Sequence, residues 1–160
     1  MSAASSDGII APGTPAPEFS LGRAGGEAFT REDLLGKTTV LVFYPFAFSP
    51  VCTDQLQIYE EALPELREQG ATLYGVSCDN TDSQRAFRES LGVTIEQLSD
   101  FEPKGETCRA FGVYHPGGFP ERALVITGPD AVIRWSYQAP SPGELPGANL
   151  IFDGLDAVPV

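Results

Sequence analysis

Apolar residues follow two different spacings along the chain, which predicts strands and helices in turn. Residues 38–44 are almost continuously β-branched or aromatic, as in a strand buried on both faces of a sheet. Leucine and tyrosine then recur at the helical period over residues 56–66, a helix that Pro64 should kink or divide. Residues 71–77 form a second apolar strand. These segments predict a β-α-β unit with parallel strands.

Shorter elements flank this unit. Before it, residues 27–36 predict a short strand and a helical turn that Thr30 and Asp33 cap and Gly36 closes. After it, the pattern predicts a helix from Asn80 or Thr81 to about residue 90, a short strand at 97–99, a short helix at 104–111 and a further short element at 150–155.

The second half of the chain contains a pair of strands around a tight turn. Residues 122–127 and 131–137 are separated by Gly-Pro-Asp, which predicts an antiparallel hairpin. A parallel unit followed by such a hairpin predicts an α/β, thioredoxin-like fold with a central mixed sheet flanked by helices. Residues 1–12 are expected to be a flexible segment, and residues 13–160 a single domain.

The net charge of the chain limits the classes of molecule that it is expected to bind. Its 160 residues include 10 Lys and Arg against 22 Asp and Glu, a net charge of −12. This field repels phosphate backbones and anionic headgroups, so we expect neither nucleic acid nor a membrane as a partner. No apolar run approaches the roughly 20 residues that span a bilayer, and the first residues do not resemble a secretory signal. A cytoplasmic location is expected.

The cysteines argue for reactivity rather than for structure. Cys52, Cys78 and Cys108 are odd in number and form no C-x-x-C pair, which argues against a disulfide framework and a zinc site. His115 is the only histidine, so the sequence offers a single candidate for the histidine of a Cys/His dyad or of a metal site. We therefore expect no metal cofactor.

Cys52 is the candidate nucleophile. It lies between the predicted strand at 38–44 and the helix that follows, at the end of a parallel strand where sites form in open sheets. With Ser49 as N-cap and Pro50 as first helical residue, Cys52 falls in the first turn, where free amides and the helix dipole favour thiolate. The residues alone equally allow Cys52 to be a buried apolar side chain, Ser49 only a cap and Pro45 only a chain stop.

Several motifs resemble one known family. The spacing Pro45-x-x-x-Ser49-x-x-Cys52 resembles the active-site signature of the peroxiredoxins, Pro-x-x-x-Thr/Ser-x-x-Cys, in which threonine is the more frequent hydroxyl residue. Four further stretches are similar to peroxiredoxin segments: the opening GTPAPEFSL (13–21), the strand LYGVSCD (73–79), SDFEPKGETCRAFGV (99–113), which resembles the one-cysteine alkyl hydroperoxide reductase E type, and ERALVIT (121–127), whose arginine is Arg122.

The resemblance implies a peroxiredoxin fold and a thiol-dependent peroxidase active in antioxidant defence. Cys52 thiolate would reduce hydrogen peroxide, an organic hydroperoxide or peroxynitrite and become a sulfenic acid. Ser49 and Arg122 would hold the peroxide and its developing charge, and Pro45 would shield the thiolate from water. No haem, flavin or metal is implied.

Recycling of Cys52 is expected to need an external thiol. Gln57 stands where one peroxiredoxin class carries its resolving cysteine, and Cys78 and Cys108 are expected to be packed thiols. The reductant would be a small thiol or a glutaredoxin-, mycoredoxin- or thioredoxin-like protein. The resemblance also implies a homodimer.

Two other functions fit the predicted fold. The first is a thiol-disulfide oxidoreductase, which would lack the usual C-x-x-C pair. The second is an acidic binding domain without redox activity. Reaction of Cys52 with stoichiometric peroxide distinguishes these functions from a peroxidase.

Overall fold

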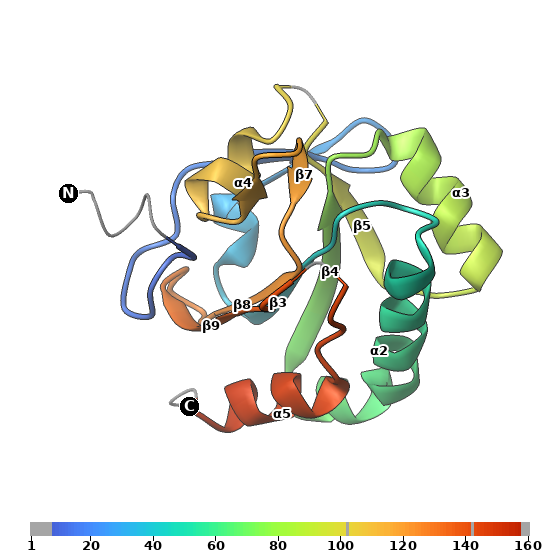
Figure 1. Cartoon of the computed structure of the whole chain (residues 1–160). Helices are drawn as coiled ribbons and strands as arrows, with labels where there is room; N and C mark the ends of the chain where they lie inside the picture. The colour runs from blue at the N-terminus through green and yellow to red at the C-terminus, as the bar shows by residue number, and fades with distance from the viewer. Residues whose placement is uncertain (1–7, 102, 142, 158–160) are drawn as a thin grey trace.

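The structure is a computed structural model that describes residues 8–101, 103–141 and 143–157 (Figure 1). Its strands are β1 (Ser20–Gly22), β2 (Ala28–Thr30), β3 (Thr38–Phe43), β4 (Ala71–Ser77), β5 (Glu96–Ser99), β6 (Tyr114–His115), β7 (Phe119–Pro120), β8 (Ala123–Thr127) and β9 (Ile133–Gln138). Its helices are the 3-10 helix η1 (Arg31–Leu34), α2 (Pro50–Glu68), α3 (Thr81–Leu91), α4 (Glu106–Ala110) and α5 (Ala148–Asp156).

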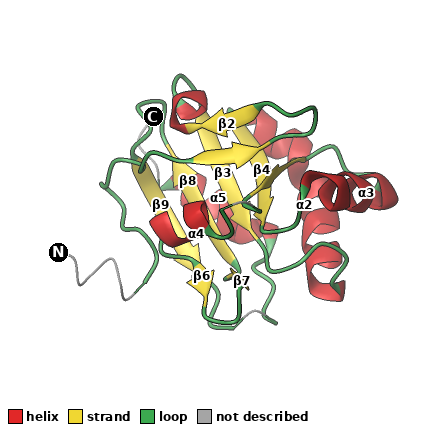
Figure 2. Ribbon diagram, turned by 90° about the horizontal axis from the view of Figure 1, so that it is seen from above, coloured by secondary structure: helices red, strands yellow, loops and turns green. Residues whose placement is uncertain are grey.

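One mixed sheet organises the fold (Figures 1 and 2). Seven strands pair in the order β2-β1-β5-β4-β3-β8-β9. The central strands β3, β4 and β5 run parallel, whereas β8 is antiparallel to both β3 and β9. The predicted β-α-β unit and hairpin are therefore confirmed. The two-stranded ribbon of β6 and β7 was not predicted, because each strand has only two residues and gives no periodic pattern.

The sheet separates two apolar clusters. Alternate residues of β3 point to opposite faces, so that Val42 packs with α2, α3 and α5, and Phe43 packs with α4, η1 and the N-terminal strands. Cys52 belongs to the cluster on the α2 face. Cys78 and Cys108 belong to the cluster on the α4 face. The sheet thus divides the three thiols between its two sides.

Helix α2 is not divided at Pro64. The proline was expected to kink or divide the helix, and α2 continues through it as one segment from Pro50 to Glu68, while a kink stays a prediction. Leu63 and Leu66, on either side of the proline, are both buried against the sheet. This packing holds the two halves together although the proline removes one helical hydrogen bond.

Part of the predicted flexible segment lies against the core. Residues 1–7 are outside the described residues, but Ile9 and Ile10 pack on the apolar cluster of the α4 face. The backbone N–H of Ile10 donates to the carbonyl of Phe111 at 2.9 Å. Ile9 and Ile10 therefore contact the core, while the flexible segment over residues 1–12 and the domain boundary at residue 13 stay predictions.

The predicted caps form as expected. The N–H of Thr30 donates to the carboxylate of Asp33 at 2.8 Å, and the side chain of Asn80 accepts from the N–H of Ser83 at 2.8 Å. None of the helices in the described part of the chain has the length and apolarity needed to cross a bilayer.

The fully buried Phe111 provides a test of the α4-face cluster. Its ring packs against those of Phe19 and Phe43, each with centroids 5.6 Å apart. Phe111→Ala should lower the free energy of unfolding by about 3–5 kcal/mol, measured by urea denaturation. Phe101, which is 48% exposed, is the matched control. Phe101→Ala should change the free energy of unfolding by less than about 0.5 kcal/mol. Equal losses in the two variants would contradict this packing.

Candidate active site

The loop between β3 and α2 places Cys52 at a helix N-terminus. Ser49 caps α2, and its Oγ accepts a hydrogen bond from the N–H of Cys52 at 3.2 Å. Pro50 is the first helical residue, which suits its fixed φ and missing N–H. The predicted cap and the first-turn position of Cys52 are therefore confirmed. The Cys52 side chain is buried beneath the helix.

Arg122 reaches Cys52 from the neighbouring strand. Strand β8 pairs with β3 so that Ala123 lies opposite Phe43, which brings Arg122 to the end of β3 where the loop begins. Arg122 is 2% exposed, and its Nη2 donates to the Sγ of Cys52 at 3.3 Å. Two residues separated by 70 positions in sequence thus meet as donor and sulfur.

A polar chain behind Arg122 fixes its orientation. Nη1 of Arg122 donates to Oε1 of Gln55 at 2.5 Å, and Nε2 of Gln55 donates to the Tyr59 hydroxyl at 3.1 Å. That hydroxyl donates in turn to the carbonyl of Pro146 at 2.6 Å. Sequence reasoning missed Gln55 and Tyr59. The available signal was their spacing, because residues three and seven positions after Cys52 share its face of a helix.

The end of this chain is a neutral phenol. Burial raises the pKa of Tyr59 to about 12, although the hydrogen bond from Gln55 and the charge of Arg122 act in the opposite direction. The hydroxyl therefore keeps its proton at neutral pH and donates it to the carbonyl of Pro146. This leaves the phenol oxygen to orient Gln55, which orients Arg122.

The loop itself is tied down at one point and strained at another. Pro45 is buried two residues after the end of β3, and the N–H of Ala47 donates to the carboxylate of Asp79 at 2.8 Å. Phe48 has a φ of +70°, a left-handed conformation that is uncommon outside glycine. Phe46 and Phe48 are both exposed. The loop therefore brings Pro45, Ser49 and Cys52 together at the cost of local backbone strain.

The other two cysteines lie together, away from Cys52. Cys78 follows β4 and Cys108 lies in α4, and both are buried, as predicted. Their Sγ atoms and a carboxylate oxygen of Asp100 all lie within 4.8 Å of one another. The sequence spacing argued against a metal site and did not predict this grouping. Both carboxylate oxygens of Asp100 accept backbone N–H bonds, from Thr107 at 3.1 Å and from Cys108 at 2.7 Å.

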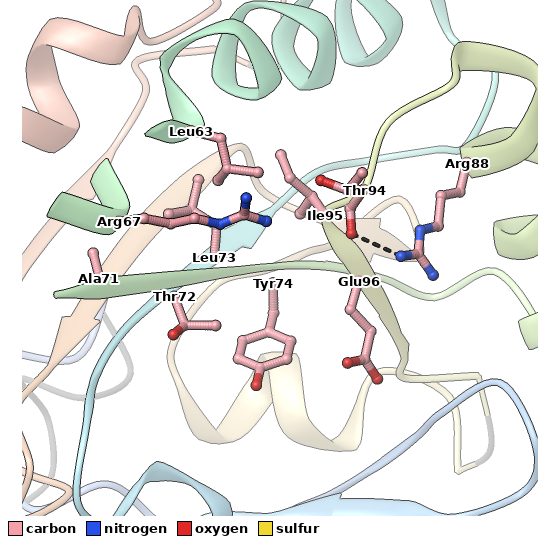
Figure 3. A pocket seen from close by; sticks show the side chains of 10 residues that line it. All are labelled: Leu63, Arg67, Ala71, Thr72, Leu73, Tyr74, Arg88, Thr94, Ile95 and Glu96. Atoms are coloured by element: carbon pink, nitrogen blue, oxygen red, sulfur yellow. Dashed lines mark hydrogen bonds between the residues drawn. The ribbon is translucent and has the colours of Figure 1, made fainter. Parts of the chain in front are cut away.

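A surface pocket at the other end of α2 contains no thiol (Figure 3). It has a volume of about 230 Å³ between α2, α3 and the start of β4, and Arg88 at its edge donates to the carbonyl of Thr94 at 2.7 Å. Leu63, which lines it, follows Cys52 by 11 residues, or roughly 16 Å along a helix. This pocket is therefore separate from the site around Cys52.

Comparison with known proteins decides the family. The AhpC/TSA family matches residues 12–136. The chain belongs to this family. Alkyl hydroperoxide reductase E of Mycobacterium tuberculosis is 28% identical over 148 residues, which cover 91% of the chain and 96% of that relative. A peroxiredoxin of Thermotoga maritima is 32% identical over 124 residues, which cover 74% of the chain and 58% of that relative.

Two solved structures have the same fold as this chain. Enterococcus faecalis AhpC matches with a TM-score of 0.81 at 28% identity, covering 91% of this chain and 90% of its own. Peroxidoxin BcpB of Mycobacterium tuberculosis also matches with a TM-score of 0.81, covering 94% of this chain and 99% of its own. The predicted peroxiredoxin fold is therefore confirmed, and so is the enzyme class, since the AhpC/TSA peroxiredoxins are thiol-dependent peroxidases.

The contact between Gln55 and Arg122 predicts a positioning effect in this AhpC/TSA protein. Gln55→Met removes the acceptor of Nη1 while keeping the length of the side chain, so Arg122 loses one of the hydrogen bonds that orient it. The second-order rate constant for oxidation of Cys52 by hydrogen peroxide, measured by stopped-flow fluorescence, should fall about tenfold, as for the loss of a hydrogen bond to a charged group.

Gln57 is the matched control, because it lies on the exposed face of the same helix. Gln57→Met should leave the rate constant unchanged. An equal rate for Gln55→Met and the parent protein would remove Gln55 from the site.

Proposed function

We propose that Cys52 is the peroxide-reactive thiol of this peroxidase and that Arg122, Ser49 and Pro45 complete its site. The observation that carries this proposal is the donation of Nη2 of Arg122 to the Sγ of Cys52 at 3.3 Å. A guanidinium does not lose its proton near neutral pH and presents several donors in a rigid fork. Arg122 is therefore suited to stabilise both the thiolate and the charge that develops during the reaction.

The reaction joins a sulfur to one peroxide oxygen. The Cys52 thiolate attacks that oxygen, the O–O bond breaks, and the other oxygen takes a proton and leaves as an alcohol or water. Cys52 becomes a sulfenic acid, oxidised by two electrons, and the peroxide is reduced by two. The negative charge moves from sulfur to the leaving oxygen, so donors placed around both atoms lower the barrier.

Ser49 and Pro45 have separate roles in this proposal. The Ser49 oxygen accepts from the N–H of Cys52, and its own O–H serves as a donor to the peroxide, since a hydroxyl can do both. Pro45 is buried at the start of the loop and supplies no N–H, which keeps water from that side of the thiol. The strained loop at Phe48 supports local opening as the route by which peroxide reaches the buried Cys52.

Reduction of the sulfenic acid is assigned to an external thiol. Gln57, five residues after Cys52, supplies no resolving thiol, and Cys78 and Cys108 lie on the opposite face of the sheet. A thiolate attacks the Cys52 sulfur and releases water, and a second thiol then displaces Cys52 from the mixed disulfide. A glutaredoxin-, mycoredoxin- or thioredoxin-like protein, or a small thiol, would supply these two thiols.

The substrates and the setting of the enzyme are part of the same proposal. Hydrogen peroxide, organic hydroperoxides and peroxynitrite share the O–O bond that the site addresses. We assign the protein to antioxidant defence in the cytoplasm, as a homodimer. The exposed Phe46 and Phe48 beside the site support a dimer, because large exposed apolar side chains are typical of interfaces.

The family match favours this function over the two alternatives. A thiol-disulfide oxidoreductase would exchange disulfides without reacting quickly with peroxide, and a redox-inactive binding domain would do neither. The arginine donor on the thiol favours the peroxidase, because it is placed to stabilise the negative charge that moves from sulfur to the leaving oxygen.

Cys52→Ser should abolish peroxide consumption, because it replaces the attacking sulfur by a hydroxyl oxygen that is not ionised at neutral pH. Consumption is measured with dithiothreitol as the reductant. Cys78→Ser is the control and should retain the first oxidation at the parent rate. Turnover of Cys52→Ser at the parent rate would disprove the assignment.

Arg122→Met should slow the oxidation of Cys52 by hydrogen peroxide by about 10²-fold or more, the scale seen when one preorganised donor is removed. The rate is measured by stopped-flow mixing of the reduced protein. Arg85→Met is the matched control on the surface of α3, and it should leave the rate unchanged. Arg122→Lys keeps a buried charge and should fall between the parent and Arg122→Met. A parent-like rate in a folded Arg122→Met protein would place Arg122 outside the reaction.

A further inference from the structure

The ends of β4 and β5 hold Cys78 next to Asp100. In the parallel pair of these strands, Ser77 lies opposite Ser99, so the next residues along the chain are neighbours. The N–H of Asp100 donates to the carbonyl of Ser77 at 2.8 Å, and this bond fixes the two strand ends to each other.

Asp100 in turn holds Cys108. Its carboxylate accepts the N–H of Cys108 at 2.7 Å, which ties the first turn of α4 to the end of β5. The Sγ atoms of Cys78 and Cys108 lie within 4.8 Å of each other as a result. Closing this gap to an S–S bond of about 2.05 Å requires side-chain rotation and a small backbone shift. The same backbone that positions α4 therefore presents two thiols to each other.

One of these thiols belongs to a residue that borders a surface pocket. Cys78 is 8% exposed and lines a surface pocket of about 240 Å³ together with Pro45, Asp79 and Lys104, whereas Cys108 is fully buried. This volume is several times that of a water molecule, about 30 Å³, and hydrogen peroxide is only slightly larger. An oxidant of this size meets Cys78 first.

We propose that Cys78 and Cys108 form a second redox site, which peroxide converts to a Cys78–Cys108 disulfide independently of Cys52. Cys78 attacks one peroxide oxygen, the O–O bond breaks, and water leaves with a proton, so that Cys78 becomes a sulfenic acid. The Cys108 sulfur then attacks the Cys78 sulfur and displaces its oxygen as a second water. The two thiols lose two electrons in total, and one peroxide gains them.

The electrostatics of the pair agree with this order of attack. The hydrogen bond from the Cys108 thiol holds the pKa of Cys78 below its ordinary value, and the charge of Lys104 acts in the same direction. The bond to Cys78 and burial, with Asp100 beside it, raise the pKa of Cys108. Cys78 is therefore the better nucleophile and Cys108 the thiol that resolves it.

The proposed disulfide also lies next to a residue that contacts the loop of Cys52. Asp79, directly after Cys78, accepts the N–H of Ala47 in that loop. The pair lies on the other face of the sheet from Cys52, so it is not a resolving partner for it. It adds one peroxide equivalent that the protein can consume, and a dithiol reductant would restore it.

The test uses the full-length Cys52→Ser protein, so its outcome does not depend on the role of Cys52. The reduced, folded protein is treated with excess hydrogen peroxide, and free thiols are then alkylated with N-ethylmaleimide in denaturant. Mass spectrometry should show loss of two hydrogens, no alkylation and a peptide pair joined through Cys78 and Cys108. Adding Cys78→Ser or Cys108→Ser to Cys52→Ser should abolish the cross-link and serves as the matched control.

Three results would overturn the proposal. In the first, both thiols still react with N-ethylmaleimide after the folded protein has been treated with peroxide, and peroxide oxidises them only in urea. Cys78 could reach the sulfinic acid while Cys108 stays a thiol. The purified protein could hold stoichiometric zinc on these side chains that keeps peroxide from them, which would make the cluster a metal site. The activity of the parent enzyme decides the function of Cys52 separately.

Discussion

The contact between the Arg122 guanidinium and the Cys52 sulfur depends on how the strands of the sheet pair. The chemistry of the site depends in turn on this contact. It exists because β8 pairs with β3 in one register, with Ala123 opposite Phe43. A shift by one residue would turn Arg122 to the other face of the sheet and away from the thiol. The buried strands hold that register, since all five residues of β8 are buried. The packing of the apolar strands therefore also fixes the position of Arg122, a charged residue that is 2% exposed.

A buried charge next to a thiol is tolerated here because each polar group has a partner. Arg122 donates to both Cys52 and Gln55, and Gln55 continues through Tyr59 to a backbone carbonyl. Removal of one member takes a hydrogen bond from its buried neighbour, which is why a glutamine that touches no substrate is expected to affect the rate. The strain at Phe48 belongs to the same arrangement, since it lets the loop turn from β3 into α2 within six residues.

The parts of this structure that the sequence predicts are the local ones. Ser49 and Cys52 lie within one helical turn, so their spacing alone predicts a cap and a first-turn thiol. Arg122 was found only by resemblance to the peroxiredoxins, because its approach to Cys52 depends on strand pairing across 70 residues. Gln55 was missed although its helical spacing places it on the face of Cys52, because spacing alone does not show that a glutamine there bonds to an arginine from another strand. The adjacency of Cys78 and Cys108 needs the parallel order of β4 and β5 and the hydrogen bond from Cys108 N–H to Asp100, neither of which leaves a pattern in the sequence.

The sheet also gives the three thiols different surroundings, with Cys52 on the α2 face beside Arg122 and the other two together on the α4 face.

The most direct test of the account is the site of first oxidation. Reduced parent protein receives one equivalent of hydrogen peroxide in the presence of dimedone, and peptide mass spectrometry locates the adduct. The account predicts the dimedone adduct on Cys52 in most molecules, with Cys78 and Cys108 still reduced. An adduct or disulfide formed first at Cys78, with Cys52 unmodified, would contradict it.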